Sequence, residues 1–412
     1  MTTIIHAPGL VLTEHEFQVP LDHAVPGGER ITLFAREVAD PQGRDRPFLV
    51  FFQGGPGQEA PRPTRGPTAP SWLDRALSEF RVLMLDQRGT GRSTPIGVLP
   101  ELAPPDQAER LRLFRADAIV QDAEWIRRAL GIETWSVLGQ SFGGFCALNY
   151  LSVAADGLRE VFFTGGVPPV GRAIDDIYRA TYATMLERNR RYYQRYPGDR
   201  DRVLALHALF DGGEISLPNG TMTGRWFRQA GNVLGMSDGA EHLHYLLERD
   251  PHSPAFAWDL EAALPFKGRN PLYAVIHEAS YADGQATRWS ADRVMPEEFH
   301  HDVSLFTGEH VFPWNFHDDN FLTPLRETAD LLAEHAWPRL YDADALRSCT
   351  VPCAAAIYAQ DAYVDRLFSE ETASLVPSMR TWVTNEYEHN ALRADGDRVL
   401  DRLIGMARGT AP

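Results

Sequence analysis

The chain has 412 residues, of which 44% are hydrophobic and 23% are charged, and its formal net charge is −16. These proportions are those of an ordinary globular protein and exclude a disordered chain. The negative charge argues against binding to nucleic acid or to an anionic membrane surface, and it favours a cationic ligand. A chain of this length forms either two domains or one α/β core enlarged by an insertion.

The cysteines and the first residues of the chain bear on its compartment. Cys146, Cys349 and Cys353 have no CxxC spacing, so we expect neither a disulfide framework nor a zinc site. The start MTTIIHAPGLVLTEHEF lacks the basic and apolar segments of a signal peptide. No run approaches the roughly 20 apolar residues of a membrane-spanning helix. We therefore expect a soluble, cytoplasmic protein.

Short apolar runs in the first part of the chain predict buried strands of a largely parallel sheet. These runs are FLVFF (48–52), RVLML (81–85), WSVLG (135–139) and EVFFTGG (160–166). Between them, residues 118–131 carry apolar side chains along one helical face and end on glycine, which stops helices. The alternation of strand and helix implies right-handed crossovers in an α/β fold.

From about residue 170 the pattern becomes helical, and strand character returns only at 353–361 and 380–385. One sheet domain built from both ends of the chain, with a helical insertion, accounts for this order. We therefore expect a first core segment at 1–168, a helical cap at 169–336 and a second core segment at 337–412.

The stretch GQSFG (139–143) satisfies the G-x-S-x-G pattern directly after a predicted strand and before a predicted helix. A turn this tight needs small neighbours and lifts the hydroxyl of Ser141 clear of the sheet, toward a base. The helix N-terminus behind it favours developing negative charge. A small-residue turn that only packs the helix on the strand is the alternative.

The stretch FFQGGPG (51–57) follows another predicted strand. Glycine lets a backbone approach a ligand closely, so the N–H of Gly55 could pair with that of Phe142 as an oxyanion hole. A simple glycine-rich turn is the alternative. The later stretch DQRGTGRS (86–93) lacks the order of a phosphate-binding loop, and we expect Arg88 and Arg92 to fasten it.

A serine nucleophile needs a base, and the base needs an orienting carboxylate. His389 lies just after the last predicted strand, and Asp361 ends the strand before it. This is the chain order Ser, acid, His of the α/β hydrolases. Asp365, four residues after Asp361, is the rival acid. The remaining histidines have no HExxH arrangement, so we expect no metal site.

Together these stretches resemble the α/β-hydrolase superfamily and, more narrowly, the proline iminopeptidases, which are serine peptidases that remove an N-terminal proline. The likeness spans nearly the whole chain in the segments FQVPLDH, QGGPG, DQRGTGRS, GQSFGG, FTGGVPP, HEASYADG, TGEHVFPW, YAQDAYVD and NEYEHNALRADG. It implies the α/β-hydrolase fold, a mostly parallel sheet flanked by helices with an inserted helical cap. One departure is Gln53, where many relatives have histidine.

The resemblance also implies how a substrate is held. Cap glutamates of the family hold the free amine of the first residue, and the matching positions are Glu278 and Glu309. A buried amine needs carboxylate partners, although either glutamate could instead fasten a helix or an arginine of the cap. Aromatic side chains could wall a pyrrolidine pocket or pack in the core, and these are Phe142, Phe145, Phe312 and Trp314.

The predicted activity is that of a serine aminopeptidase that releases an N-terminal proline, or a small residue, from small peptides through an acyl-enzyme. Ser141, His389 and Asp361 are its predicted catalytic residues, and no cofactor is required. An esterase or acyltransferase with the same residues is the alternative, as is a ligand-binding protein that has lost turnover. Dehalogenase or epoxide-hydrolase chemistry is disfavoured because those relatives generally have aspartate at the position of Ser141. Oligomeric state stays open.

Overall fold

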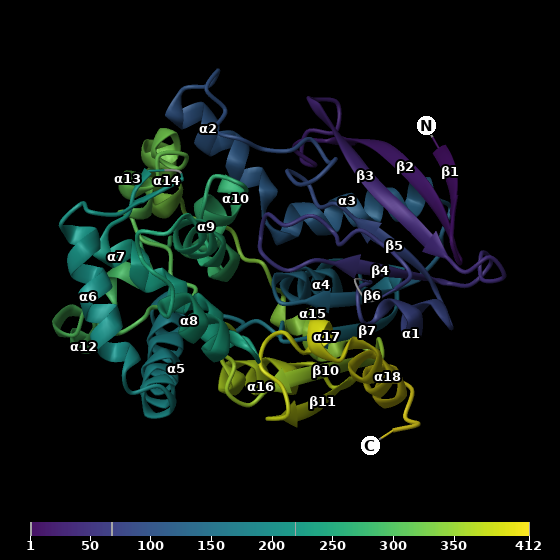
Figure 1. Cartoon of the computed structure of the whole chain (residues 1–412). Coiled ribbons are helices and arrows are strands. Elements are labelled where there is room, and N and C mark those ends of the chain that lie inside the picture. The colour runs from purple at the N-terminus through teal and green to yellow at the C-terminus, as the bar shows by residue number, and fades with distance from the viewer. Residues whose placement is uncertain (1, 67–68, 219, 412) are drawn as a thin grey trace.

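The computed structural model describes residues 2–66, 69–218 and 220–411. Within these ranges a nine-stranded sheet has the order β1-β2-β3-β5-β4-β6-β7-β10-β11 (Figure 1). The six strands from β5 to β11 in this order run parallel, whereas β1, β2 and β3 add an antiparallel edge. The protein is therefore an α/β protein with a mixed, mostly parallel sheet.

The strands of this sheet are β1 (Thr2–Ala7), β2 (Leu10–Pro20), β3 (Arg30–Ala39), β4 (Phe48–Phe52), β5 (Arg81–Leu85), β6 (Trp135–Gln140), β7 (Leu158–Thr164), β10 (Cys353–Tyr358) and β11 (Met379–Thr384). The helices around it are α1 (Leu73–Leu77), α2 (Pro104–Leu111), η1 (Arg112–Phe114), α3 (Ala116–Ala129), α4 (Phe142–Val153), η2 (Ala155–Gly157), α15 (Ala343–Ser348), α16 (Arg366–Leu375), α17 (Ala391–Ala394) and α18 (Gly396–Ala407).

Side-chain alternation along β4 shows how the sheet becomes the middle layer. All five residues of this strand are buried. Phe48, Val50 and Phe52 join the apolar cluster that contains α3 and α4, whereas Leu49 and Phe51 join the cluster that contains α1 and α18. Burial on both faces explains why the strand is a continuous apolar run rather than an alternating one.

The strands predicted at 48–52 and 81–85 are confirmed residue for residue as β4 and β5, and the helix predicted at 118–131 is α3. The antiparallel strands β1, β2 and β3 were not predicted, because their exposed face carries charges instead of apolar side chains. Glu14 of β2 lies opposite Arg36 of β3, and the two side chains form an ion pair of 2.6 Å. A strand with such cross-strand charge pairs has no continuous apolar run, so a search for apolar runs does not find it.

The chain between β7 and α15 adds no described strand to the large sheet and gathers on one side of it, on the left of Figure 1. Its elements are α5 (Ile174–Arg195), α6 (Asp199–Asp211), β8 (Ser216–Leu217), β9 (Gly220–Thr221), α7 (Gly224–Phe227), η3 (Arg228–Gly235), α8 (Gly239–Leu247), α9 (Pro254–Ala263), α10 (Pro271–Ile276), η4 (Glu278–Tyr281), α11 (Ser290–Arg293), α12 (Glu297–His301), α13 (Asn315–Asp318), η5 (Thr323–Leu325) and α14 (Arg326–Glu334). We propose 169–336 as the bounds of this cap, with 1–168 and 337–412 as the core.

The cap and the sheet domain share one buried apolar cluster, which runs from α4 into the cap helices without a break. Phe145 of α4 marks the junction, because its ring lies 5.2 Å from that of Tyr281 in η4. In the described part of the chain, no helix is long and apolar enough to cross a membrane.

Candidate active site

Ser141 stands at the turn between β6 and α4 with a φ of 54° and a ψ of −125°. A positive φ is uncommon for a residue with a side chain, and it marks local strain. The turn depends on glycine: a Cβ on Gly143 would come within 2.0 Å of the carbonyl oxygen of Phe52, at the end of β4. The sequence therefore brings the first turn of α4 against the sheet and leaves the hydroxyl exposed above it.

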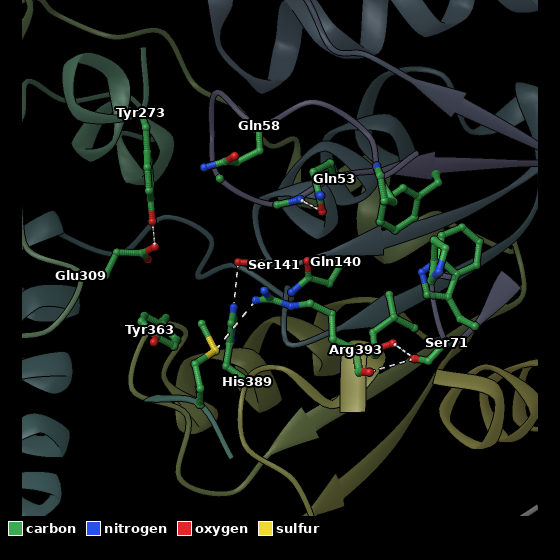
Figure 2. A pocket seen from close by; sticks show the side chains of 18 of the residues that line it. Gln53, Gln58, Ser71, Gln140, Ser141, Tyr273, Glu309, Tyr363, His389 and Arg393 are labelled. Carbon is green, nitrogen blue, oxygen red and sulfur yellow. Dashed lines mark hydrogen bonds between the residues drawn. The ribbon is translucent and has the colours of Figure 1, made fainter. Parts of the chain in front are cut away.

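The hydroxyl of Ser141 lies 2.8 Å from Nε2 of His389, and Nδ1 of His389 lies 2.7 Å from Oδ2 of Asp361 (Figure 2). A carboxylate only accepts hydrogen bonds, so Nδ1 carries the ring proton and Nε2 is free to accept from the serine. Both His389 and Asp361 are buried, with exposures of 5% and 3%. The structure thus brings together three residues that are far apart in sequence.

Two further hydrogen bonds hold Asp361 in this orientation. Its Oδ1 accepts from the backbone N–H groups of Tyr363 at 2.9 Å and Val364 at 3.1 Å. Asp365 instead caps α16, because its carboxylate accepts from the N–H groups of Leu367 and Phe368. The rival acid therefore has its hydrogen bonds at the helix terminus and not at His389.

The glycine stretch after β4 lies beside the serine. Both Gly54 and Gly55 line the cavity above Ser141, and a Cβ on Gly54 would lie 3.1 Å from the Cβ of Ser141. The N–H of Gly54 donates to the side-chain oxygen of Gln53 at 3.0 Å. Among the described residues no acceptor contacts the N–H of Gly55 or of Phe142, so both donors are free for a ligand.

The loop at 86–93 is held to its neighbours by ion pairs, of which that between Arg88 and Asp122 is buried. Arg88 donates to both oxygens of Asp122, at 2.7 and 2.6 Å, and Arg92 pairs with Glu14 at 2.8 Å. Arg62, from the proline-rich segment at 59–70, donates to both oxygens of Asp86. The prediction that Arg88 and Arg92 fasten this loop is confirmed.

A cavity of about 620 Å³ opens above the serine, between the sheet domain and the cap. The sheet domain contributes Gly54, Gly55, Gln140, Ser141 and His389, and the cap contributes Asn232, Met236, Tyr273 and Glu309. This volume lies within the range of small-molecule sites.

Glu309 is the carboxylate that the cap presents to this cavity. The hydroxyl of Tyr273 donates to its Oε1, and Figure 2 shows the two side chains meeting to the left of Ser141. Burial raises the pKa of Glu309 from 4.5 to about 7, although the Tyr273 hydrogen bond and His389 both act to lower it. The group therefore changes charge near neutral pH, and a cation beside it would favour the charged form.

Two buried histidines fix the backbone on either side of Glu309. Nε2 of His277 lies 3.1 Å from the carbonyl oxygen of Glu309, and Nδ1 of His310 accepts from the N–H of Gly308. Burial lowers the pKa of His277 to about 4 and that of His310 to about 3, so both rings are neutral at pH 7. The cap therefore positions Glu309 without placing a competing charge beside it.

Glu278 lies in η4, away from the cavity lining. Its two oxygens accept from the backbone N–H groups of Ser290 at 3.2 Å and Ala291 at 2.8 Å, at the start of α11. Burial raises its pKa to about 7. The geometry therefore brings Glu309 to the serine but leaves Glu278 with backbone partners inside the cap.

The predicted aromatic residues also lie outside the cavity lining. The buried ring of Phe145 packs between Phe142 at 6.1 Å and Tyr281 at 5.2 Å. Trp314 stacks on Phe312 with centroids 4.8 Å apart. The aromatic residues that do line the cavity are Phe51, Trp72, Tyr273 and Tyr363, and the ring of Tyr363 lies 4.6 Å from that of His389.

Sequence reasoning did not single out Gly54, Tyr273, Tyr363 or Arg393, all of which line the cavity. Some signals were present. Gly54 belongs to the QGGPG stretch, Tyr363 follows Asp361 by two residues, and Arg393 follows His389 by four. Tyr273 has no such signal, because only the fold of the cap brings it to Glu309.

Comparison with known proteins agrees with this geometry. A family model described as the alpha/beta hydrolase fold matches residues 47–261. The chain is 46% identical to a proline iminopeptidase of Aeromonas sobria, with 97% of each chain covered. It is 32% identical to a proline iminopeptidase of Aspergillus aculeatus, with 97% of this chain and 94% of that protein covered. The chain therefore belongs to the proline iminopeptidase family of α/β hydrolases.

Proposed function

We propose that the protein is a serine aminopeptidase that releases an N-terminal proline, or another small residue, from small peptides. The observation that carries this proposal is the hydrogen-bonded series from Ser141 through His389 to Asp361, at the base of a cavity that also holds Glu309. The names of the full-length relatives support the same substrate class.

The first chemical step forms an acyl-enzyme. Ser141 Oγ attacks the carbonyl carbon of the first residue, and its proton passes to His389 Nε2. Asp361 holds the ring and stabilises the positive charge that forms on it. The C–N bond then breaks, and the leaving amine takes the proton from Nε2. Water next attacks the ester, gives a proton to Nε2, and the acyl group leaves as the serine recovers that proton.

The N–H groups of Gly55 and Phe142 are the proposed donors to the oxyanion. Phe142 is the first residue of α4, where the helix dipole favours negative charge. Gln53 supports this loop, because its side chain holds the N–H of Gly54 and its carbonyl oxygen accepts from Gln87 at 3.1 Å. The donors are therefore in place before the substrate carbonyl becomes negative.

Glu309 is the proposed partner of the substrate's free amine. A partly buried carboxylate near the serine favours a cationic first residue and rejects a chain whose nitrogen is acylated, since an acylated nitrogen carries no charge. Glu278 keeps its backbone hydrogen bonds in this proposal, and we do not assign it to the amine. No cofactor takes part in the proposed steps.

Replacement of Ser141 by alanine tests the proposal most simply. With prolyl p-nitroanilide as substrate, Ser141→Ala should lower kcat by about 10⁴- to 10⁶-fold, because the nucleophile is lost. Ser152→Ala is the matched control, since this serine lies on the same helix with its hydroxyl bonded to Leu148 and outside the cavity. A Ser141→Ala variant that keeps most of its activity refutes the mechanism. Wild-type protein that hydrolyses p-nitrophenyl acetate but not the prolyl substrate is an esterase instead.

The three cysteines bear on the compartment. All are free thiols and all are buried. Free thiols are typical of a reducing compartment, so we place the protein in the cytoplasm as part of this proposal.

A further inference from the structure

Arg393 is a cation at the rim of the catalytic cavity that has no carboxylate partner among the described residues. The side chain is exposed, and its guanidinium makes one contact there, from Nη2 to Sδ of Met236 at 3.9 Å. Arg62 lines the same cavity but donates to both oxygens of Asp86, at 2.8 and 2.9 Å. Of these two cavity arginines, Arg393 is therefore the one with donors free for a ligand.

The backbone beneath Arg393 is held firmly although its side-chain head is free. Arg393 lies in α17, and Oγ of Ser71 is 2.8 Å from the carbonyl oxygen of Leu392 and 3.0 Å from that of Arg393. The same Oγ accepts from the N–H of Gly396. Because this backbone is already fixed, a ligand that binds Arg393 has to order only the side chain and not the segment that carries it.

The two charged side chains Glu309 and Arg393 enter the cavity from different segments, Glu309 from the cap and Arg393 from α17. In Figure 2, Glu309 and Tyr273 lie on one side of Ser141, whereas Arg393 enters the cavity from the side of Ser71 and its guanidinium reaches back toward Ser141, to the Sδ of Met236. Glu309 is the single carboxylate among the residues that line the cavity in the described chain. A substrate whose amine lies at Glu309 and whose carbonyl lies at Ser141 directs its leaving group away from Glu309, toward Arg393.

We propose that Arg393 binds the C-terminal carboxylate of short peptide substrates, so that the enzyme favours dipeptides and tripeptides over longer chains. This inference rests on the proposed aminopeptidase function. A guanidinium matches a carboxylate in geometry and charge. An extended chain grows by about 3.3–3.6 Å per residue, so each added residue carries the carboxylate farther from a fixed cation.

The test compares Pro-Gly with Pro-Gly-amide, which differ in the terminal charge and hardly in size. Wild-type enzyme should have a kcat/KM about fivefold higher for the acid, the size expected of a partly exposed ion pair, and high salt should reduce this ratio. The preference should also fall along the series Pro-Gly, Pro-Gly-Gly and Pro-(Gly)₅, each compared with its own amide.

Variants of Arg393 connect the preference to this side chain. Arg393→Met should bring the acid-to-amide ratio to about one, Arg393→Glu should invert it, and Arg393→Lys should retain part of it. Arg159→Met is the control with the same charge change. Arg159 is exposed at the opposite end of the parallel strands, in β7, and makes no ion pair with a described residue. This control should keep the wild-type ratio.

The outcomes separate this inference from the proposed function. Equal kcat/KM for acid and amide in the wild type, or an unchanged ratio in Arg393→Met, overturns the role of Arg393. Prolyl p-nitroanilide has no carboxylate, so its hydrolysis tests the aminopeptidase function alone. If Arg393→Met does not fold, as thermal unfolding would show, Arg393→Lys and the salt dependence of the wild-type ratio decide the inference.

Discussion

At the scale of single residues, Glu309 is the side chain whose chemistry depends most on its surroundings. Its pKa, raised by burial to about 7, means that the carboxyl is neutral in acid and charged above neutral pH. Binding of a cationic amine needs the charged form. The kcat/KM for prolyl p-nitroanilide should therefore rise as pH increases through about 7, because kcat/KM reports groups of the free enzyme.

Removal of the Tyr273 hydroxyl tests this assignment. The hydroxyl donates to Glu309 and stabilises its charged form, so Tyr273→Phe should raise the pKa of Glu309 and move the rise in kcat/KM to higher pH. Tyr245→Phe, an exposed position on α8, serves as the control. Since p-nitrophenyl acetate has no amine, its pH profile reports the catalytic base without Glu309. If Tyr273→Phe does not shift the pH profile of kcat/KM for prolyl p-nitroanilide, the result would argue against Glu309 as the group that binds the amine.

At the scale of elements, the contact between β4 and α4 places the nucleophile. A Cβ on Gly143 would lie 2.0 Å from the carbonyl oxygen of Phe52, so Gly143→Ala must push the helix from the sheet. We expect a loss of about 1–3 kcal/mol in the free energy of unfolding, measured in urea, and a large fall in kcat. Gly27→Ala is the control, because a Cβ there meets nothing within 4 Å. A fully active and stable Gly143→Ala variant would contradict this picture of the turn.

The strands and helices that could be predicted are those whose burial requires a recognisable pattern of apolar side chains. β4 and β5 are buried on both faces, so their sequences are continuous apolar runs. β2 has one face in water and charges such as Glu14 on it, which removes that signal. The helix α3 could be predicted for the same reason: it buries one face, and that face carries apolar side chains.

In the site, the residues that could be predicted from the sequence are those whose position follows from the topology of the sheet. Ser141, Asp361 and His389 each follow a strand of the parallel sheet, and the ends of such strands meet at one edge. The orientation of side chains within the cap obeys no comparable rule. Glu278 and Glu309 have the same chemistry, and only packing decides that one contacts α11 and the other faces the cavity.

At the scale of the whole molecule, the site exists only where the sheet domain and the cap meet. In the proposed mechanism the sheet domain supplies the nucleophile and its base, and the cap supplies Glu309 as the carboxylate for the amine. A single apolar cluster through Phe145 and Tyr281 holds the two parts together. The proposed function therefore assigns cleavage chemistry and recognition of a free N-terminus to different segments of one chain.

The most direct test of the claim that Glu309 of the cap recognises the free amine compares two substrates, prolyl p-nitroanilide and its N-acetylated form. Both are measured with the wild type and with Glu309→Gln. We predict that the wild type has a kcat/KM about 10- to 150-fold higher for the free amine, which is the contribution of hydrogen bonds to a charged group, and that Glu309→Gln loses most of this preference. Equal cleavage of the acetylated substrate by the wild type, or an undiminished preference in Glu309→Gln, would contradict it.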